Sequence, residues 1–125
     1  MNKITTNFSR EEFDCKDGTP YPSDWIASRL KPLCDALEII RASRGKVMTV
    51  NSGYRTPEYN KKIGGAVRSK HMEGIACDIK LEGMGVKKLY ELIDRLQRAN
   101  IIPRGGLGLY SSFVHYDTRG HIARF

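Results

Sequence analysis

SKHMEGIACDIKL, the stretch from Ser69 to Leu81, decides the fold of this chain. From Ile75 onward it alternates apolar residues with small or polar ones, which is the pattern of a half-buried strand. Side chains on a strand point alternately to its two faces, so Asp78 lies on the face opposite the apolar residues. Gly74 allows a tight turn just before the strand. We therefore predict a strand that turns its apolar face to the core and presents a carboxylate on the other face.

A second segment, FVHYD at residues 113–117, has the composition of another strand. It follows the strand-like residues 107–110 after a polar pair of serines. On an ideal strand His115 and Asp117 point to the same side. At that spacing Asp117 can either orient His115 or transfer a proton beside it.

His71, Asp78 and His115 together form a ligand set suited to a catalytic zinc ion. Zinc accepts histidine nitrogen and carboxylate oxygen, and catalytic sites typically use three protein ligands and keep a fourth position for water or substrate. Taken singly, each histidine also suits an ordinary core or surface position. The three together predict a metal centre.

Short motifs spread along the chain extend this pattern. They are FSxxEFxC at 8–15, SGYRT at 52–56, Asn60, GGA at 64–66, SxHxxGxAxD at 69–78 and GxYxxFVHxDxRG at 108–120. With these motifs the chain closely resembles the zinc D-alanyl-D-alanine carboxypeptidase family, in particular its compact phage or bacterial members. Those metallopeptidases cleave peptidoglycan stem peptides and share a fold with the Hedgehog signalling domain. The motifs reach across nearly the whole chain.

The resemblance implies that His71, Asp78 and His115 are the zinc ligands. It also implies that Arg55 holds a substrate or transition-state oxygen. Several family members carry a glutamate or aspartate as general base three residues before the second histidine ligand, and Ser112 occupies that place here.

With a serine at that place, two carboxylates elsewhere can be considered for the general base: Asp117 is the nearer candidate and Glu73 the weaker one. Asp117 can instead bond a turn or hold Arg119, and Glu73 can be a solvated turn residue. Ser69, two residues before His71, is expected either to support that ligand through a hydrogen bond or to cap a turn.

The function implied is a zinc-dependent peptidase that hydrolyses peptidoglycan stem peptides, as a D,D-carboxypeptidase or an endopeptidase, of the kind used as phage cell-wall lytic enzymes. The alternative is a non-catalytic cell-wall-binding or structural module with the same fold. The presence of Arg55 beside the three ligands favours the enzyme. Ser112, in place of an acid, favours the alternative.

The expected architecture is α+β: one domain over residues 1–125, with an antiparallel sheet that carries the zinc site and is flanked by helices. Strand patterns fall at 47–51, 75–81 and 113–117, and the tail 118–125 is expected to close the sheet. Helical patterns fall at 9–12, from 23 or 24 to 43, at 57–62 and at 86–99. Pro32 is expected to kink or break the second of these helices.

The formal net charge of +7 attracts polyanions, among which we considered cell walls and nucleic acid. The basic residues are scattered without a known nucleic-acid-binding motif, so no nucleic-acid partner is expected. No apolar run suggests a membrane span, and no signal-peptide pattern follows Met1. We expect a monomer, made in the cytoplasm, that acts on the wall after release or as part of a phage particle.

Cys15, Cys34 and Cys77 make an odd count without a CxxC pair, which argues against a cysteine zinc site and a disulfide framework. Cys77 is expected to be a small buried hydrophobic residue on the core face of its strand. A Cys15–Cys34 bridge stays open from the sequence.

Overall fold

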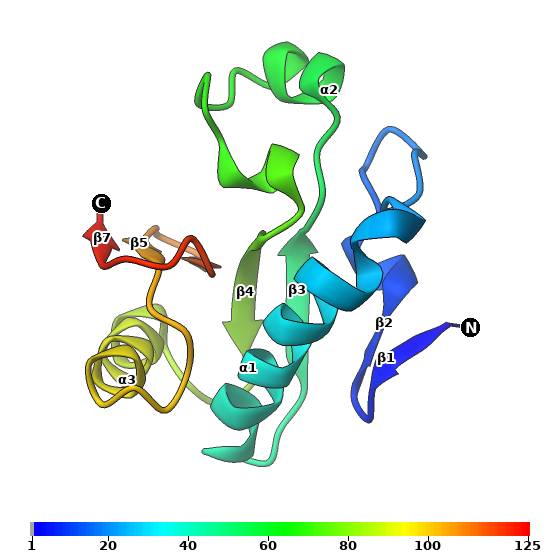
Figure 1. Ribbon diagram of the computed structural model, residues 1–125. Helices are drawn as coiled ribbons and strands as arrows, with labels where there is room; N and C mark the ends of the chain where they lie inside the picture. The colour runs from blue at the N-terminus through cyan, green and yellow to red at the C-terminus, as the bar shows by residue number, and fades with distance from the viewer. Residues whose placement is uncertain (1) are drawn as a thin grey trace.

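A five-stranded sheet forms the centre of the computed structural model, which describes residues 2–125 (Figure 1). The strands lie in the order β3–β4–β6–β5–β7, and their bounds are Met48–Ser52 for β3, Ala76–Leu81 for β4, Val114–Asp117 for β6, Gly106–Leu109 for β5 and Ala123–Arg124 for β7. The α+β prediction is confirmed. The pairs from β3 to β5 are antiparallel, as expected.

The last strand departs from the expected antiparallel sheet, because β7 runs parallel to β5. After β6 the chain reverses around Gly120 and pairs with the free edge of β5. Arg124 fastens this strand to helix α3 (Val86–Arg98): its guanidinium donates to Asp94 Oδ1 at 2.8 and 3.0 Å and to Gln97 Oε1 at 2.7 Å. Asp94 is half-buried where the tail contacts this helix.

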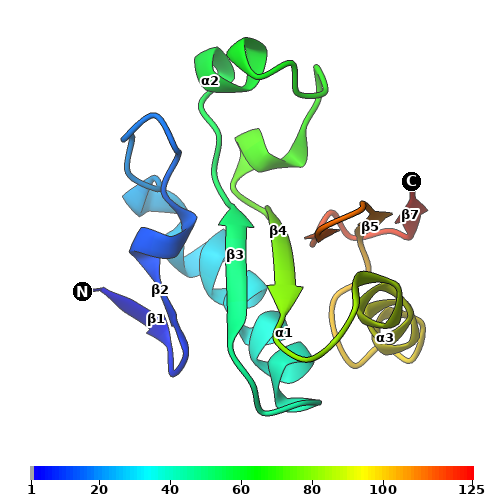
Figure 2. The ribbon, with the colours of Figure 1, turned by 180° about the vertical axis from the view of Figure 1, so that it is seen from behind.

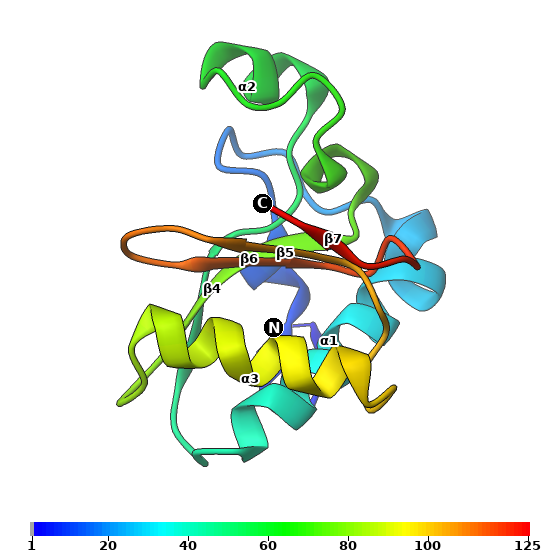
Figure 3. The same cartoon turned by 90° about the vertical axis from the view of Figure 1, so that its left-hand side faces the viewer.

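The helices are divided between the two faces of the sheet (Figures 2 and 3). Helices α1 (Lys31–Ala42) and α3 lie on one face, where they cover the core. Helix α2 (Pro57–Lys62) and the 3-10 turn Lys70–Glu73 lie on the opposite side (Figure 3). Strand β4 alternates as predicted: Cys77 and Ile79 are fully buried in the core, and Asp78 faces the other way.

The predicted helix from residue 23 or 24 to 43 is divided into three pieces. It begins as a 3-10 turn at Ser23–Trp25, continues as a π-helical turn at Ile26–Leu30 and becomes α-helical only from Lys31. Pro32 stands in the first turn of α1, where its missing N–H costs nothing. A regular helix through this point would bring the proline ring against the carbonyl four residues earlier, so the break lies before Pro32.

The amino-terminal residues form a hairpin that the sequence patterns did not predict, from β1 (Lys3–Thr5) and β2 (Phe8–Ser9). A capping box lies at the start of the short helical segment expected at 9–12. The Glu12 carboxylate accepts the Ser9 backbone N–H at 2.8 Å, and Ser9 is the residue at which the 3-10 turn Arg10–Phe13 begins.

All three cysteines are free and buried, so the structure contains no Cys15–Cys34 bridge. Burial raises the pKa of the Cys34 and Cys77 thiols well above the usual range.

Within residues 2–125, no helix has the length and apolar character that a membrane span requires.

Candidate metal centre

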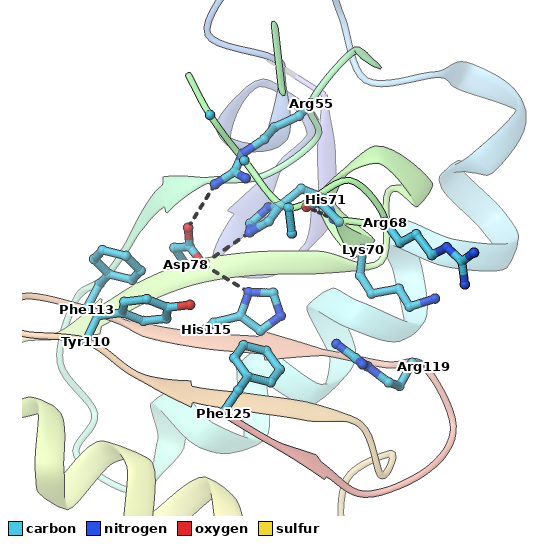
Figure 4. Close-up of a pocket in the computed structure, with 14 residues that line it drawn as sticks. Arg55, Arg68, Lys70, His71, Asp78, Tyr110, Phe113, His115, Arg119 and Phe125 are labelled. Carbon is cyan, nitrogen blue, oxygen red and sulfur yellow. Dashed lines mark hydrogen bonds and ion pairs between the residues drawn. The ribbon is translucent and has the colours of Figure 1, made fainter. Parts of the chain in front are cut away.

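Two neighbouring strands bring the predicted ligands together. Strands β4 and β6 pair in a register that sets Asp78 directly opposite His115. His71 comes from the 3-10 turn Lys70–Glu73, immediately before β4. One donor atom from each of the three side chains lies within 4.8 Å of the other two, and all three residues are buried (Figure 4). The structure thus assembles the ligand set expected from the sequence.

The hydrogen bonds made by the two imidazoles decide which nitrogens face Asp78. His71 Nδ1 lies 2.7 Å from the Gly53 carbonyl oxygen, which can only accept, so Nδ1 carries a proton. His115 Nε2 donates in the same way to Asp117 Oδ2 at 2.8 Å. The remaining nitrogens, His71 Nε2 and His115 Nδ1, each lie 3.2 Å from Asp78 Oδ1.

Neutral imidazoles so oriented would point two nitrogen lone pairs at one carboxylate oxygen. Three acceptors that converge in this way repel one another unless a proton or a metal cation lies among them. Zinc prefers these donors. A histidine that ligates zinc usually donates its other ring N–H to a carbonyl or carboxylate, as His71 does to Gly53 and His115 does to Asp117. The donor set and its supports therefore fit zinc.

The ionisation of the group agrees with this arrangement. Burial opposes charge on Asp78, but hydrogen bonds with His115 and His71 outweigh it, and the pKa of Asp78 is lowered. Burial likewise opposes the charged form of His115, yet the carboxylates of Asp117 and Asp78 raise the pKa of this imidazole. The Asp78 carboxylate therefore stays ionised and can ligate a cation, which must displace any proton that the raised pKa places on His115.

Asp117 lies behind His115 and does not line the cleft described below. Its side chain is fully buried and accepts hydrogen bonds from His115, from the Gly106 N–H at 2.8 Å, and from Arg119 at 2.7 and 2.9 Å. Gly106 is needed for this approach, because a Cβ there would lie 2.2 Å from Asp117 Oδ2. Despite burial, hydrogen bonds from His115 and Arg119 lower the pKa of Asp117. This geometry favours the orienting role among the two considered for Asp117.

Neither Ser112, which stands where the resemblance places the base, nor Glu73, the weaker candidate, lines the cleft. Ser112 is exposed and faces a separate hollow beside β3 and β4. Glu73 is exposed, bonds Lys70 Nζ at 2.9 Å and does not line the cleft. Asp78 provides the one carboxylate side chain among the described residues that line the cleft.

Ser69 begins the turn that carries His71. Its hydroxyl accepts the His71 backbone N–H at 3.2 Å, so Ser69 caps the turn, whereas the outer nitrogen of the His71 ring bonds the Gly53 carbonyl. Gly74 ends the turn with a φ of +72°, and its carbonyl accepts a 2.6 Å hydrogen bond from the Tyr21 hydroxyl.

Replacing Gly74 with alanine should destabilise the fold and disturb the His71 turn. A Cβ at this position would lie 2.7 Å from both Trp25 Cε3 and the Tyr21 hydroxyl oxygen, in addition to the strain of a positive φ. Gly45→Ala is the matched control, since Gly45 has a φ of +63° but a Cβ there would meet no other atom within 4 Å. Urea unfolding should show Gly74→Ala to be less stable than Gly45→Ala by about 1–3 kcal/mol, the usual cost of overpacking. Equal stabilities would show that the contacts with Tyr21 and Trp25 do not constrain the turn.

Arg55 approaches the metal group from the loop after β3. Its Nη2 lies 3.4 Å from Asp78 Oδ2 and its Nη1 lies 3.3 Å from Asn60 Oδ1. Its backbone N–H donates to the His71 carbonyl at 3.1 Å, which ties the two loops together. The Nε of Arg55 is buried with no hydrogen-bond partner among the described residues. The guanidinium is thus held beside the metal group with bonding capacity to spare.

A cleft of about 520 Å³ opens onto the metal group (Figure 4). The cleft contains the three residues of the metal group and four cationic side chains. Three further lining residues are aromatic. The lining residues are Arg55, Gly64, Gly65, Ala66, Arg68, Ser69, Lys70, His71, Asp78, Tyr110, Phe113, His115, Arg119 and Phe125. Phe125, brought in by β7, packs its ring 5.1 Å from that of His115, a wall that sequence patterns did not reveal.

Two comparisons with known proteins bear on the identity of the chain. A search of curated proteins found no match. The family model described as Peptidase M15, a family of zinc metallopeptidases, matches residues 6–117. This range includes Arg55 and all three residues of the metal-binding group. Since the match spans most of the sequence, the chain belongs to the Peptidase M15 family.

Proposed function

We propose that the protein is a zinc peptidase that hydrolyses the stem peptides of peptidoglycan, as a D,D-carboxypeptidase or an endopeptidase. The observation that carries the proposal is the convergence of His71 Nε2, His115 Nδ1 and Asp78 Oδ1 at the base of an open cleft. Three protein ligands with access to substrate are typical of catalytic zinc, whereas structural zinc sites are closed by four. Membership of the Peptidase M15 family supports the same reaction class.

Each side chain of the centre has a distinct part in such a reaction. When bound, zinc lowers the pKa of a coordinated water from ~15.7 toward ~7 and polarises a substrate carbonyl. His71, Asp78 and His115 would hold the ion, and Gly53 and Asp117 keep the two imidazoles in the required tautomers. Arg55 can donate to a substrate carboxylate or to the oxygen on which negative charge develops.

The charge of the cleft supports an anionic peptide as substrate. Arg55, Arg68, Lys70 and Arg119 all line it, against the one carboxylate of Asp78. Peptidoglycan stems carry carboxylates, and the net charge of +7 adds long-range attraction to the polyanionic wall. In the proposed setting the protein reaches the wall after release from the cell or as part of a phage particle.

A non-catalytic cell-wall-binding module is the second candidate. The observation in its favour is that neither Glu73 nor Asp117 lines the cleft and Ser112 is not an acid, so within residues 2–125 Asp78 provides the one carboxylate side chain there. Such a module would bind zinc and wall peptides without turnover.

Digestion of purified peptidoglycan tests the two candidates. The zinc-loaded protein should release products that mass spectrometry identifies, and a chelator should stop the release until zinc is restored. Free D-alanine would indicate a carboxypeptidase, and larger peptides an endopeptidase. Zinc-dependent binding to the walls without any released product would exclude the peptidase and leave the binding module.

A further inference from the structure

The cleft has two chemically different sides (Figure 4). Tyr110 and Phe113 lie together on one side, with stacked rings whose centroids are 4.6 Å apart. Arg68 and Lys70 lie on the other side, beyond His71, and Arg119 lies below them in this view. A substrate that crosses the metal group therefore meets aromatic rings at one end and cations at the other.

The cations of the cleft differ in how far protein carboxylates already neutralise them. Arg119 is bound to Asp117 at 2.7 Å, and Lys70 Nζ to Glu73 at 2.9 Å. Arg55 Nη2 lies 3.4 Å from Asp78. Arg68 alone among the four has no ion pair or side-chain hydrogen bond with any residue from 2 to 125.

The position of Arg68 suits it to meet a ligand. It ends the loop that follows α2, and the hydrogen bond from Asn60 Nδ2 to the Ala66 carbonyl at 2.8 Å fixes that loop against α2. Ser69, the next residue, caps the turn that carries His71. The backbone on both sides of Arg68 is thus anchored, while its exposed side chain lines the cleft and points its guanidinium away from His71 and Asp78 (Figure 4).

We propose that Arg68 is a specificity-determining residue that binds a substrate carboxylate away from the bond being cut. The inference rests on the proposed function, and we assign the free α-carboxylate of the γ-linked D-glutamate in the stem peptide as the group bound. This carboxylate remains in place whichever neighbouring bond is hydrolysed. A guanidinium pairs with a carboxylate through two parallel hydrogen bonds, which gives geometric selectivity that a lysine lacks.

The test compares two synthetic stem pentapeptides that differ at one group: L-alanyl-γ-D-glutamyl-L-lysyl-D-alanyl-D-alanine and its analogue with the glutamate α-carboxylate replaced by a carboxamide. The zinc-loaded protein should prefer the acid, and Arg68→Ala should raise KM for the acid about 10-fold while leaving kcat and the amide unchanged. Arg68→Lys should retain part of the preference. Arg95→Ala removes an exposed arginine on α3 that lies outside the cleft, and should change nothing.

The outcomes separate this inference from the proposed function. Hydrolysis of both peptides with equal loss in Arg68→Ala would overturn the role of Arg68 and leave the peptidase intact. If neither peptide is cut, digestion of whole peptidoglycan still decides the proposed function, and calorimetric binding of the same pair tests Arg68 directly. A preference for the acid that depends on Arg68 would support it, whereas equal binding, or no binding, would overturn it. The preference should also shrink at high salt, because Arg68 is exposed.

Discussion

Replacing Asp78 with asparagine should lower zinc affinity by more than about 100-fold, since changes even to the residues that support metal ligands cost about 10–100-fold. Asp78 Oδ1 lies 3.2 Å from both ligating imidazole nitrogens. The variant keeps the shape of the side chain but removes the negative charge that attracts the ion. Hydrolysis should be lost with the metal. A competition titration against a chromogenic chelator measures the affinity.

A matched variant separates this effect from a general change in charge. Asp24→Asn removes one negative charge at an exposed position in the 3-10 turn Ser23–Trp25, away from the cleft. Its zinc affinity should equal that of the unmodified protein. Undiminished zinc binding by Asp78→Asn would mean that the ion is held elsewhere, and the proposed centre would be wrong.

Replacing Asp117 with alanine should weaken both zinc binding and the fold. The substitution leaves the Gly106 N–H, the Arg119 guanidinium and the outer N–H of His115 without their shared acceptor. Loss of one partner of a buried ion pair costs about 3 kcal/mol or more in unfolding free energy. His115 would lose the bond that fixes its tautomer, so zinc affinity should fall by about 10–100-fold. Urea unfolding of the metal-free protein and a chelator titration measure the two effects.

The same variant distinguishes the two roles considered for Asp117. A general base would leave zinc affinity unchanged when removed and would abolish only turnover. An orienting residue changes zinc affinity first, and activity should recover when excess zinc refills the site. Arg119→Ala is the companion control, because it exposes Asp117 to solvent but keeps the bond to His115. Unchanged zinc affinity in Asp117→Ala would contradict the orienting role.

Local patterns in the sequence predicted much of this structure. The period-2 alternation of residues 75–81 corresponds to β4, and the predicted helix at 57–62 corresponds to α2. The helix expected at 86–99 ends one residue earlier, at Arg98. These elements depend on which side chains can be buried on one face, and that information lies within a few consecutive residues.

Features that depend on distant residues could not be read in this way. The hairpin of β1 and β2 is two short strands with little pattern of their own, and α1 holds it through Glu38, which accepts hydrogen bonds from Thr5 and Asn7. The parallel pairing of β7 depends on Arg124 finding Asp94 across the fold. The wall that Phe125 adds to the cleft follows from that pairing.

The sequence by itself determined the ligand types, their strands and the family resemblance, because spacing and residue chemistry are local properties. Tertiary structure alone decided how they meet. The β4–β6 register places Asp78 opposite His115, 37 residues away, and the same packing buries Asp117 behind that histidine. Two carboxylates of the same chemistry thus face opposite sides of one imidazole, and only their burial and hydrogen-bond partners distinguish a metal ligand from a supporting residue.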